Sequence, residues 1–174
     1  MIKLLSAPDP APALAVMVQA GVLGHVLPGA DATLISPLVH LEQLAGVEPD
    51  PMARLAALGG EDVATRLRLS RSEQKRLKRI RMHSGSVLGP KAIGHVAGEQ
   101  AGFGAILLRA AMANTPVESS VLSAVKEGAT TTFPIKAGDL SPLEGKALGD
   151  ALSALKEDWL ASDLTKTKNQ LLNS

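Results

Sequence analysis

Cysteine is absent from the 174-residue sequence. Its absence excludes disulfide bonds, a thiolate nucleophile and cysteine-ligated zinc, and it fits a reducing compartment, so the cytoplasm is the expected location. Tyrosine is absent too, and Phe103, Phe133 and Trp159 are the only aromatic residues. The hydrophobic residues, 45% of the chain, are mainly Ala, Leu and Val, a mixture that favours helices over sheets.

Long apolar runs are also missing from the sequence. Proline, glycine or a charged residue interrupts every run before the roughly 18 residues that a membrane-spanning helix needs. The opening residues 1–5 lack the long apolar core of a signal peptide. We therefore expect no membrane partner and no targeting segment.

The charged residues are unevenly distributed along the chain, although the formal net charge is only +1. Residues 66–81 contain eight of the 18 basic residues and a single acid, Glu73. The rest of the chain contains ten basic and 16 acidic residues. The sequence thus predicts a molecule with one basic surface and an acidic remainder.

Signals that start and stop helices recur at short intervals, and no alternating run bounded by a tight-turn dipeptide predicts a hairpin. We predict an all-α fold with no catalytic α/β head. A multi-helix body is expected over residues 1–115, followed by a smaller helical tail over residues 116–174.

Helices are expected at residues 10–20, 32–44, 51–58, 70–83, 105–113, 117–126 and 146–161. The apolar residues expected to pack inward are Leu14, Val16, Met17 and Val18 in the first of these helices, Ile106, Leu107, Leu108 and Met112 in the fifth, and Leu148, Leu152, Leu155 and Trp159 in the last. The stretch 85–104 is expected to be broken, the stretch 128–142 to be an extended connection, and the chain after residue 163 to fray.

No pattern in the sequence predicts a catalytic or metal-binding residue. The four histidines, His25, His40, His83 and His95, lack metal-ligand spacing and a catalytic partner. Gly94, Gly98, Gly102 and Gly104 match neither phosphate-loop pattern, so close helix packing is the better interpretation. Glu61-Asp62 with Arg66 suggests a nucleotide-reading motif, but Asp62 and Arg66 are spaced as an ordinary helical ion pair.

The basic stretch is the one feature that indicates a function. Ser70 and Glu73 have the spacing of a capping box that begins a helix. On that helix Arg71, Lys75, Lys78, Arg79 and Met82 share one broad side, Arg68 and Arg76 flank it, and Leu77 and Ile80 lie opposite. A phosphate backbone suits such a surface. The predicted RNA-binding residues are Arg68, Arg71, Lys75, Arg76, Lys78 and Arg79.

Three other interpretations of this helix stay open at the level of sequence. The charges can form a solvated face that acids elsewhere balance. The helix can belong to a protein-interaction module that binds an acidic partner. A small DNA-binding regulator would need a base-reading amide, for which Gln74 alone is available.

A series of short segments runs through nearly the whole chain in a fixed order. These segments are KLLSAPDP at 3–10, GVL at 21–23, HVLP at 25–28, RLAAL at 54–58, LRLS at 67–70, LLRAA at 107–111 and FPIK at 133–136, followed by Gly145, Gly149, Leu152, Leu155 and Trp159. In this order the chain resembles the body region of bacterial tRNA nucleotidyltransferases, the CCA-adding enzymes, and of their poly(A) polymerase relatives.

The resemblance implies that the chain is the RNA-binding C-terminal portion of a template-independent nucleotidyltransferase, with tRNA as the expected partner. It also implies a catalytic head domain in the same parent chain, before the position of Met1. That head would bind Mg²⁺ and nucleoside triphosphates, so no cofactor is expected in the present chain. Whether the parent adds CCA or poly(A) stays open.

Overall fold

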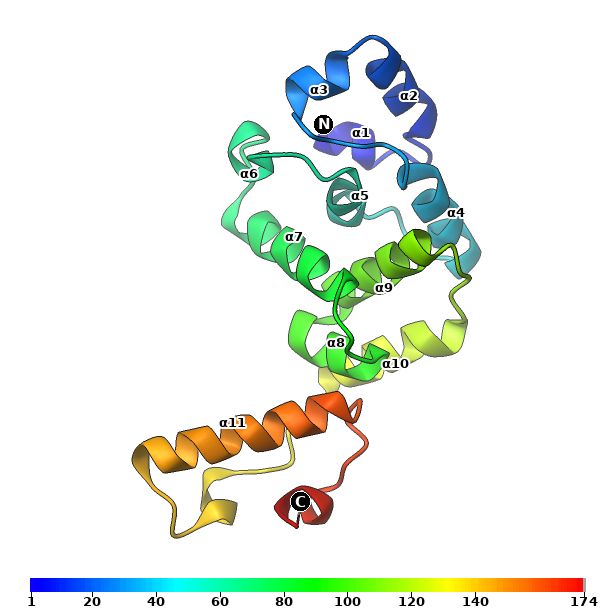
Figure 1. Ribbon diagram of the computed structural model, residues 1–174. Helices are drawn as coiled ribbons and strands as arrows, with labels where there is room; N and C mark the ends of the chain where they lie inside the picture. Colours follow the sequence, from blue (N-terminus) through cyan, green and yellow to red (C-terminus); the bar gives the residue numbers. More distant parts are fainter. Residues whose placement is uncertain (174) are drawn as a thin grey trace.

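The computed structural model describes residues 1–173, and over this range the chain forms twelve α-helices and one short 3-10 helix, η1 (Figure 1). Their bounds are α1 (Ile2–Leu5), α2 (Ala11–Gln19), α3 (Val22–Val26), α4 (Ile35–Ala45), α5 (Pro51–Leu58), α6 (Val63–Arg66), α7 (Arg71–Ser84), α8 (Pro90–Ala97), α9 (Glu99–Ala113), α10 (Ser119–Thr130), η1 (Ala137–Leu140), α11 (Gly145–Ala161) and α12 (Lys168–Leu172). The predicted all-α fold is confirmed. Ser174, the last residue of the predicted tail, lies outside the described residues.

Within residues 1–173, extended pairing is limited to one isolated bridge between Ala30 and Gly59. Every predicted helix is present, whereas α1, α3, α6, α8 and α12 have no counterpart among the predicted helices. None of the described helices combines the length and the apolar character that crossing a membrane requires.

Helices α1 to α10 share one hydrophobic core. α7 packs along α9, and α8 packs against α10 (Figure 1). Fully buried leucine and isoleucine side chains from α1, α2, α4, α5, α7 and α8 fill the centre: Leu5, Leu14, Ile35, Leu38, Leu55, Ile80 and Ile93. Leu122 and Val125 of α10 belong to the same cluster, although they lie beyond the predicted body boundary at residue 115.

A buried ion pair ties the N-terminal segment to this core. Arg54 of α5 and Glu42 of α4 are 1% and 2% exposed, and two guanidinium nitrogens donate to Glu42 Oε2 at 2.7 and 2.9 Å. The same guanidinium donates to three backbone carbonyls of the N-terminal segment, those of Leu5, Ala7 and Pro8. Arg54 therefore satisfies a buried carboxylate and holds α1 and the following loop in place.

Close backbone contact explains the helices that the sequence did not predict between residues 85 and 104. A Cβ atom on Gly94 of α8 would lie 2.0 Å from the carbonyl oxygen of Val125, and one on Gly128 of α10 would lie 1.9 Å from that of Lys91. Gly102 of α9 faces the same crossing, with Val125 Cγ1 2.6 Å from its hypothetical Cβ. The expectation of a broken stretch was wrong, because these glycines let helices approach rather than end.

The tail has a small hydrophobic cluster of its own. Ile135, Trp159 and Leu171 are buried there, and half-buried Phe133, Leu140, Leu152, Leu155, Leu160 and Leu164 pack around them. The Phe133 ring lies 5.3 Å from the Trp159 ring, centroid to centroid. Leu171 belongs to α12, which Thr167 begins with a capping box, so the expected fraying after residue 163 was wrong.

Thr131, Trp159 and Asp163, which follow α10, contact α8. The His95 ring meets the Trp159 ring edge to face at 5.0 Å, and His95 Nδ1 lies 2.9 Å from the Thr131 carbonyl oxygen. The Ala92 N–H donates to the Asp163 carboxylate at 2.8 Å, so a residue of the tail caps the first turn of α8. Gly89 is required beside that carboxylate, because a Cβ atom there would lie 2.4 Å from Asp163 Cγ.

Several predicted core positions are exposed. Val16 and Val18 are 64% and 51% exposed, because α2 turns Ala11, Leu14 and Met17 toward the core instead. Met112 is 58% exposed near the end of α9. The stretch 128–142 is also less extended than expected, since α10 continues to Thr130 and η1 follows at Ala137–Leu140.

Replacing Arg54 by Met should destabilise the body by about 3–5 kcal/mol, because it leaves the Glu42 carboxylate buried without a partner. Glu42→Gln should cost less, since the amide oxygen can still accept from Arg54. Chemical denaturation monitored by circular dichroism measures both. Arg76→Met, which breaks a partly exposed pair with Asp50, is the matched control and should cost about 1 kcal/mol. Equal losses for Arg54→Met and Arg76→Met would contradict the central role of Arg54.

Trp159→Ala should lower the stability of the tail by about 3–5 kcal/mol, because a large buried side chain is replaced by a cavity. The Trp159 side chain is 2% exposed and contacts both Phe133 and His95. Thermal melting measures the effect, with Leu143→Ala, at a half-exposed leucine of the tail, as the control. Unchanged melting with a loss of RNA affinity would show instead that Trp159 contacts RNA.

Candidate nucleic-acid interface

The basic helix α7 begins at a reciprocal capping box, as predicted. The Glu73 N–H donates to Ser70 Oγ at 3.3 Å, and the Ser70 N–H donates to Glu73 Oε2 at 2.7 Å. Hydrogen bonds from the Ser70 hydroxyl and backbone hold the pKa of Glu73 below its ordinary value. The only acid among the eight basic residues is therefore occupied at the start of the helix, where a carboxylate also suits the helix dipole.

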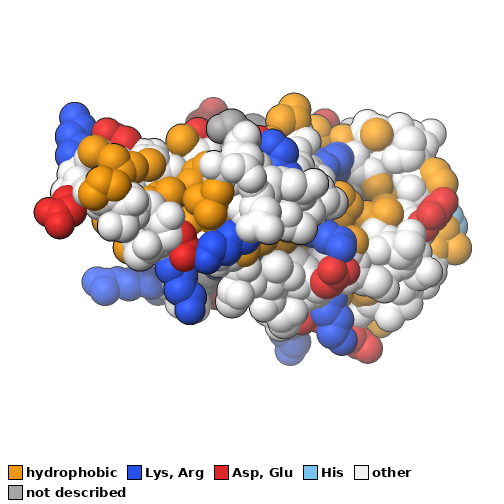
Figure 2. All heavy atoms as spheres, turned by 90° about the horizontal axis from the view of Figure 1, so that it is seen from below, with side chains coloured by type: hydrophobic (Ala, Val, Ile, Leu, Met, Phe, Trp, Pro, Cys, Tyr) orange, Lys and Arg blue, Asp and Glu red, His pale blue; other side chains and the backbone are white. Residues whose placement is uncertain are grey.

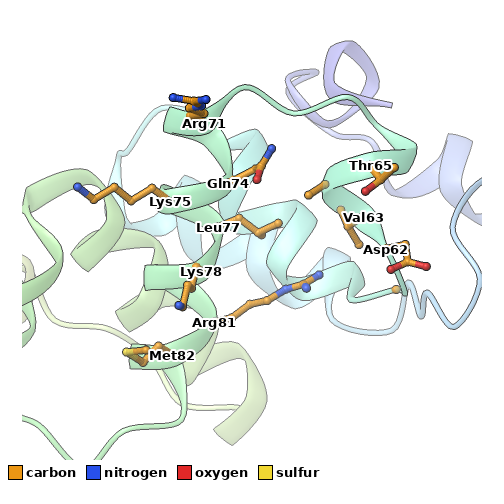
Figure 3. Close-up of a pocket in the computed structure, with 12 residues that line it drawn as sticks. Asp62, Val63, Thr65, Arg71, Gln74, Lys75, Leu77, Lys78, Arg81 and Met82 are labelled. Atoms are coloured by element: carbon orange, nitrogen blue, oxygen red, sulfur yellow. The ribbon is translucent and has the colours of Figure 1, made fainter.

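An open groove of about 870 Å³ lies between α6 and α7, and we call it the α6–α7 groove (Figure 3). It is lined by Gly60, Asp62, Val63, Ala64, Thr65, Arg71, Gln74, Lys75, Leu77, Lys78, Arg81 and Met82. Buried Val63 and Leu77 give it an apolar floor. Gln74 Nε2 donates to the Leu69 carbonyl at 2.8 Å, which ties α7 to the turn that connects it with α6.

Three of the predicted RNA-binding residues line this groove. Arg71, Lys75 and Lys78 are exposed, and the described part of the chain provides no ion-pair or hydrogen-bond partner for any of them. In Figure 3, Gln74 and Arg81 point from α7 toward α6, whereas Lys75 points away from α6. The groove thus has a wall of free positive charge on the α7 side.

Arg81 was missed by the sequence analysis and also lines the α6–α7 groove. Its guanidinium donates to the Gly59 carbonyl at 3.0 Å, and burial lowers its pKa from the ordinary value. The spacing of Arg81 from Lys78 and Leu77, three and four residues along the helix, is the signal that could have placed it on this face.

The other three predicted residues lie elsewhere. Arg76 Nη2 binds Asp50 Oδ2 at 2.7 Å, and Arg79 Nη1 donates to the Ala97 carbonyl at 3.1 Å. Both line a second groove on the opposite flank of α7, here called the α7–α9 groove. Arg68 lies in the turn before α7 with a left-handed backbone, φ 51°, and is exposed.

The ion pair expected between Asp62 and Arg66 does not form within the described residues. Asp62 has a left-handed backbone, φ 49°, and precedes α6, which is a single turn long. Its carboxylate is therefore not on a helix face with Arg66. Asp62 instead lines the α6–α7 groove opposite the basic residues of α7.

No group of three or more histidine, aspartate or glutamate side chains is placed to hold a metal ion among residues 1–173. The tail end of the molecule carries charges of both signs: Figure 2 shows lysine and arginine side chains next to aspartate and glutamate over this face. Two ion pairs of the tail account for part of this mixture, Lys166 with Asp158 and Lys168 with Asp139. The wall of unpaired cations on α7 is therefore the feature best suited to a polyanion.

Comparison with models of known protein families gave no match, and comparison with curated proteins gave none either.

His83 near the end of α7 should make stability depend on pH. Burial, and then the charges of Arg79 and Arg109, lower its pKa below the ordinary 6.5, and its buried Nδ1 has no hydrogen-bond partner within residues 1–173. As the pH drops through the ordinary value, His83 binds a proton in the unfolded chain but not in the folded chain, so stability falls. Melting temperatures at about pH 7.5 and about pH 5.5 span this change.

The variant His83→Gln removes the titrating group and should show a smaller drop in melting temperature over the same interval. Its melting temperature near pH 7.5 corrects for any loss of packing. An identical drop in the variant and in the wild type would assign the pH dependence to other groups.

Proposed function

We propose that this chain binds structured RNA through α7 and forms the RNA-holding portion of a nucleotidyltransferase that acts on RNA 3′ ends. The observation that carries the proposal is the wall formed by Arg71, Lys75 and Lys78. These three exposed cations lie on one helix at the edge of an open groove and have no carboxylate partner among the described residues. The neighbouring Arg76, by contrast, pairs with an acid of the fold.

Phosphate contacts explain such a wall better than base contacts do. Each phosphate that a lysine or arginine neutralises releases counterions, and this gain needs no base sequence. Proteins that bind single strands stack bases on aromatic platforms, and α7 contains no aromatic residue. A double-helical RNA offers a regular array of phosphates that the cations can follow by shape, as an enzyme acting on all tRNAs would need.

The resemblance to bacterial tRNA nucleotidyltransferases supports tRNA as the specific partner. Several segments that carry the resemblance contain residues that stabilise the fold. RLAAL contains Arg54 and LLRAA contains Arg109, both of which donate to backbone carbonyls, and the final segment contains the buried Trp159. In this proposal, nucleotide transfer itself belongs to a head domain of the parent chain, where Mg²⁺ and nucleoside triphosphates would bind. The present chain would bind the RNA and orient it.

The floor of the α6–α7 groove favours a second candidate, a module that binds an acidic protein segment. Val63 and Leu77 are apolar, and Met82 at the rim is 56% exposed. An amphipathic acidic helix could place its apolar residues there and its carboxylates against α7. Binding that persists at high salt and needs a protein partner would favour this candidate over RNA.

The triple variant Arg71→Gln, Lys75→Gln, Lys78→Gln should bind tRNA more weakly than wild type while keeping its helix content. Each lost phosphate contact should lower the slope of log affinity against log salt by about 0.7 to 0.9. Affinities measured by fluorescence anisotropy at several salt concentrations give that slope. The matched control, Lys3→Gln, Lys126→Gln, Lys146→Gln, removes the same charge from exposed lysines outside the groove.

Unrelated tRNAs and an unstructured oligonucleotide of equal length complete the test. Similar affinity for all tRNAs, with weaker binding of the unstructured strand, supports recognition of RNA shape. A preference for the single strand, or an equal loss in the triple variant and in its control, would overturn the proposal.

A further inference from the structure

The α7–α9 groove, on the other flank of α7, holds a compact group of cations. It has a volume of about 410 Å³ and is lined by Ser72, Lys75, Arg76, Arg79, Ala97, Gly98, Glu99, Gln100 and Ala101. Three of these residues are basic and Glu99 is the only acid. Glu99 is exposed. Asp50 offsets the charge of Arg76, whereas Lys75 and Arg79 have no carboxylate partner among the described residues.

Both arginines of the groove are held in position by the fold. Arg76 is fixed through Nη2 by Asp50, the residue that caps α5, and Arg79 is fixed through Nη1 by the last carbonyl of α8. Each guanidinium therefore keeps further N–H donors, and their positions are fixed by these hydrogen bonds. Guanidinium groups pre-oriented in this way lose little side-chain entropy when they bind an anion.

One of these remaining donors lacks an acceptor. Arg76 Nε is buried, and no hydrogen-bond partner for it exists among the described residues. A buried N–H without an acceptor is destabilising, and a charged one more so. Because this N–H is closed off from solvent, Arg76 acts on an anion in the groove through its charge and not through Nε.

The backbone at the groove is also open to an anion. Gly98 has φ +83° and begins α9 without a side-chain cap, and a Cβ atom on it would have nothing within 4 Å. The first N–H groups of α9 therefore have no intrahelical acceptor and carry the positive end of the helix dipole. They add to a site that the two arginines already define.

We propose that the α7–α9 groove is a binding site for a phosphate group, separate from the α6–α7 groove. The free donors of Arg79 and the first backbone N–H groups of α9 bind the phosphate oxygens, and Arg76 and Lys75 add positive charge. Lys75 lines both grooves, so α7 carries phosphate-binding surface on two flanks. RNA as the source of the phosphate rests on the proposed function, whereas the phosphate site itself does not.

Titration of the ¹⁵N-labelled chain with inorganic phosphate tests the site directly. The resonances to follow are the Arg79 Nε–H and the backbone amides of residues 99–101. Sodium chloride at matched ionic strength provides the reference. Phosphate should shift these resonances in a saturable way and chloride should not.

Two variants on the same helix remove one positive charge each, from different flanks. Arg79→Gln should raise the dissociation constant for phosphate about tenfold, the loss expected for one charge-assisted hydrogen bond. Lys78→Gln, which lines only the α6–α7 groove, should leave it nearly unchanged. Arg79→Lys keeps the charge but loses the planar guanidinium, so its dissociation constant should lie between those of the other two variants. This third variant controls for a folding defect in Arg79→Gln.

The results separate this site from the proposed function. A shift of the backbone amides of residues 99–101 on adding tRNA, lost in Arg79→Gln, identifies an RNA phosphate as the ligand. Binding of phosphate without a response to tRNA keeps the site and identifies free phosphate as its ligand. Chloride reproducing the shifts, or equal weakening by Arg79→Gln and Lys78→Gln, would overturn the inference, because both point to diffuse charge rather than a built site.

Discussion

The buried pair of Arg54 and Glu42 is the constraint on which the arrangement of the body depends. Two charges removed from water are tolerated only if nearly every donor and acceptor is satisfied, and the Arg54 guanidinium meets this condition by binding one carboxylate and three loop carbonyls. Glu42 also accepts from the Asp50 N–H at 3.5 Å. The start of the chain, α4 and the cap of α5 are thereby positioned together, and Asp50 in turn holds Arg76 of α7.

That chain of contacts divides the positive charges of α7 into two kinds. Arg76, Arg79 and Arg81 are bound to groups of the fold and hold α7 against α5, α8 and the Gly59 turn. Arg71, Lys75 and Lys78 are left for solvent or a partner. One basic helix thus both binds neighbouring elements of the fold and presents free charge. The two roles belong to different residues rather than to different sides, since Arg81 lines the same groove as Arg71 and Lys78.

Local signals predicted where α5 and α7 begin. The Ser70–Glu73 capping box and Pro51 after the capping Asp50 involve neighbours in sequence, so the printed residues suffice. The partners of Arg76, Arg79 and Arg81 lie 26, 18 and 22 residues away, so sequence alone placed these arginines on a helix but could not show that the fold binds them. Close helix packing at Gly94 was predicted, but its partner, Val125 of another helix, could not be read from the sequence for the same reason.

The contact between Asp163 and the Ala92 N–H makes α8 an incomplete helix without the tail, because its first turn is capped by a residue 71 positions further along the chain. Docking of the tail and formation of the first turn of α8 are therefore coupled, and each stabilises the other by the same free energy. The other end of α8 is Ala97, whose carbonyl accepts a hydrogen bond from Arg79 at the edge of the α7–α9 groove. One short helix therefore connects the tail with this groove.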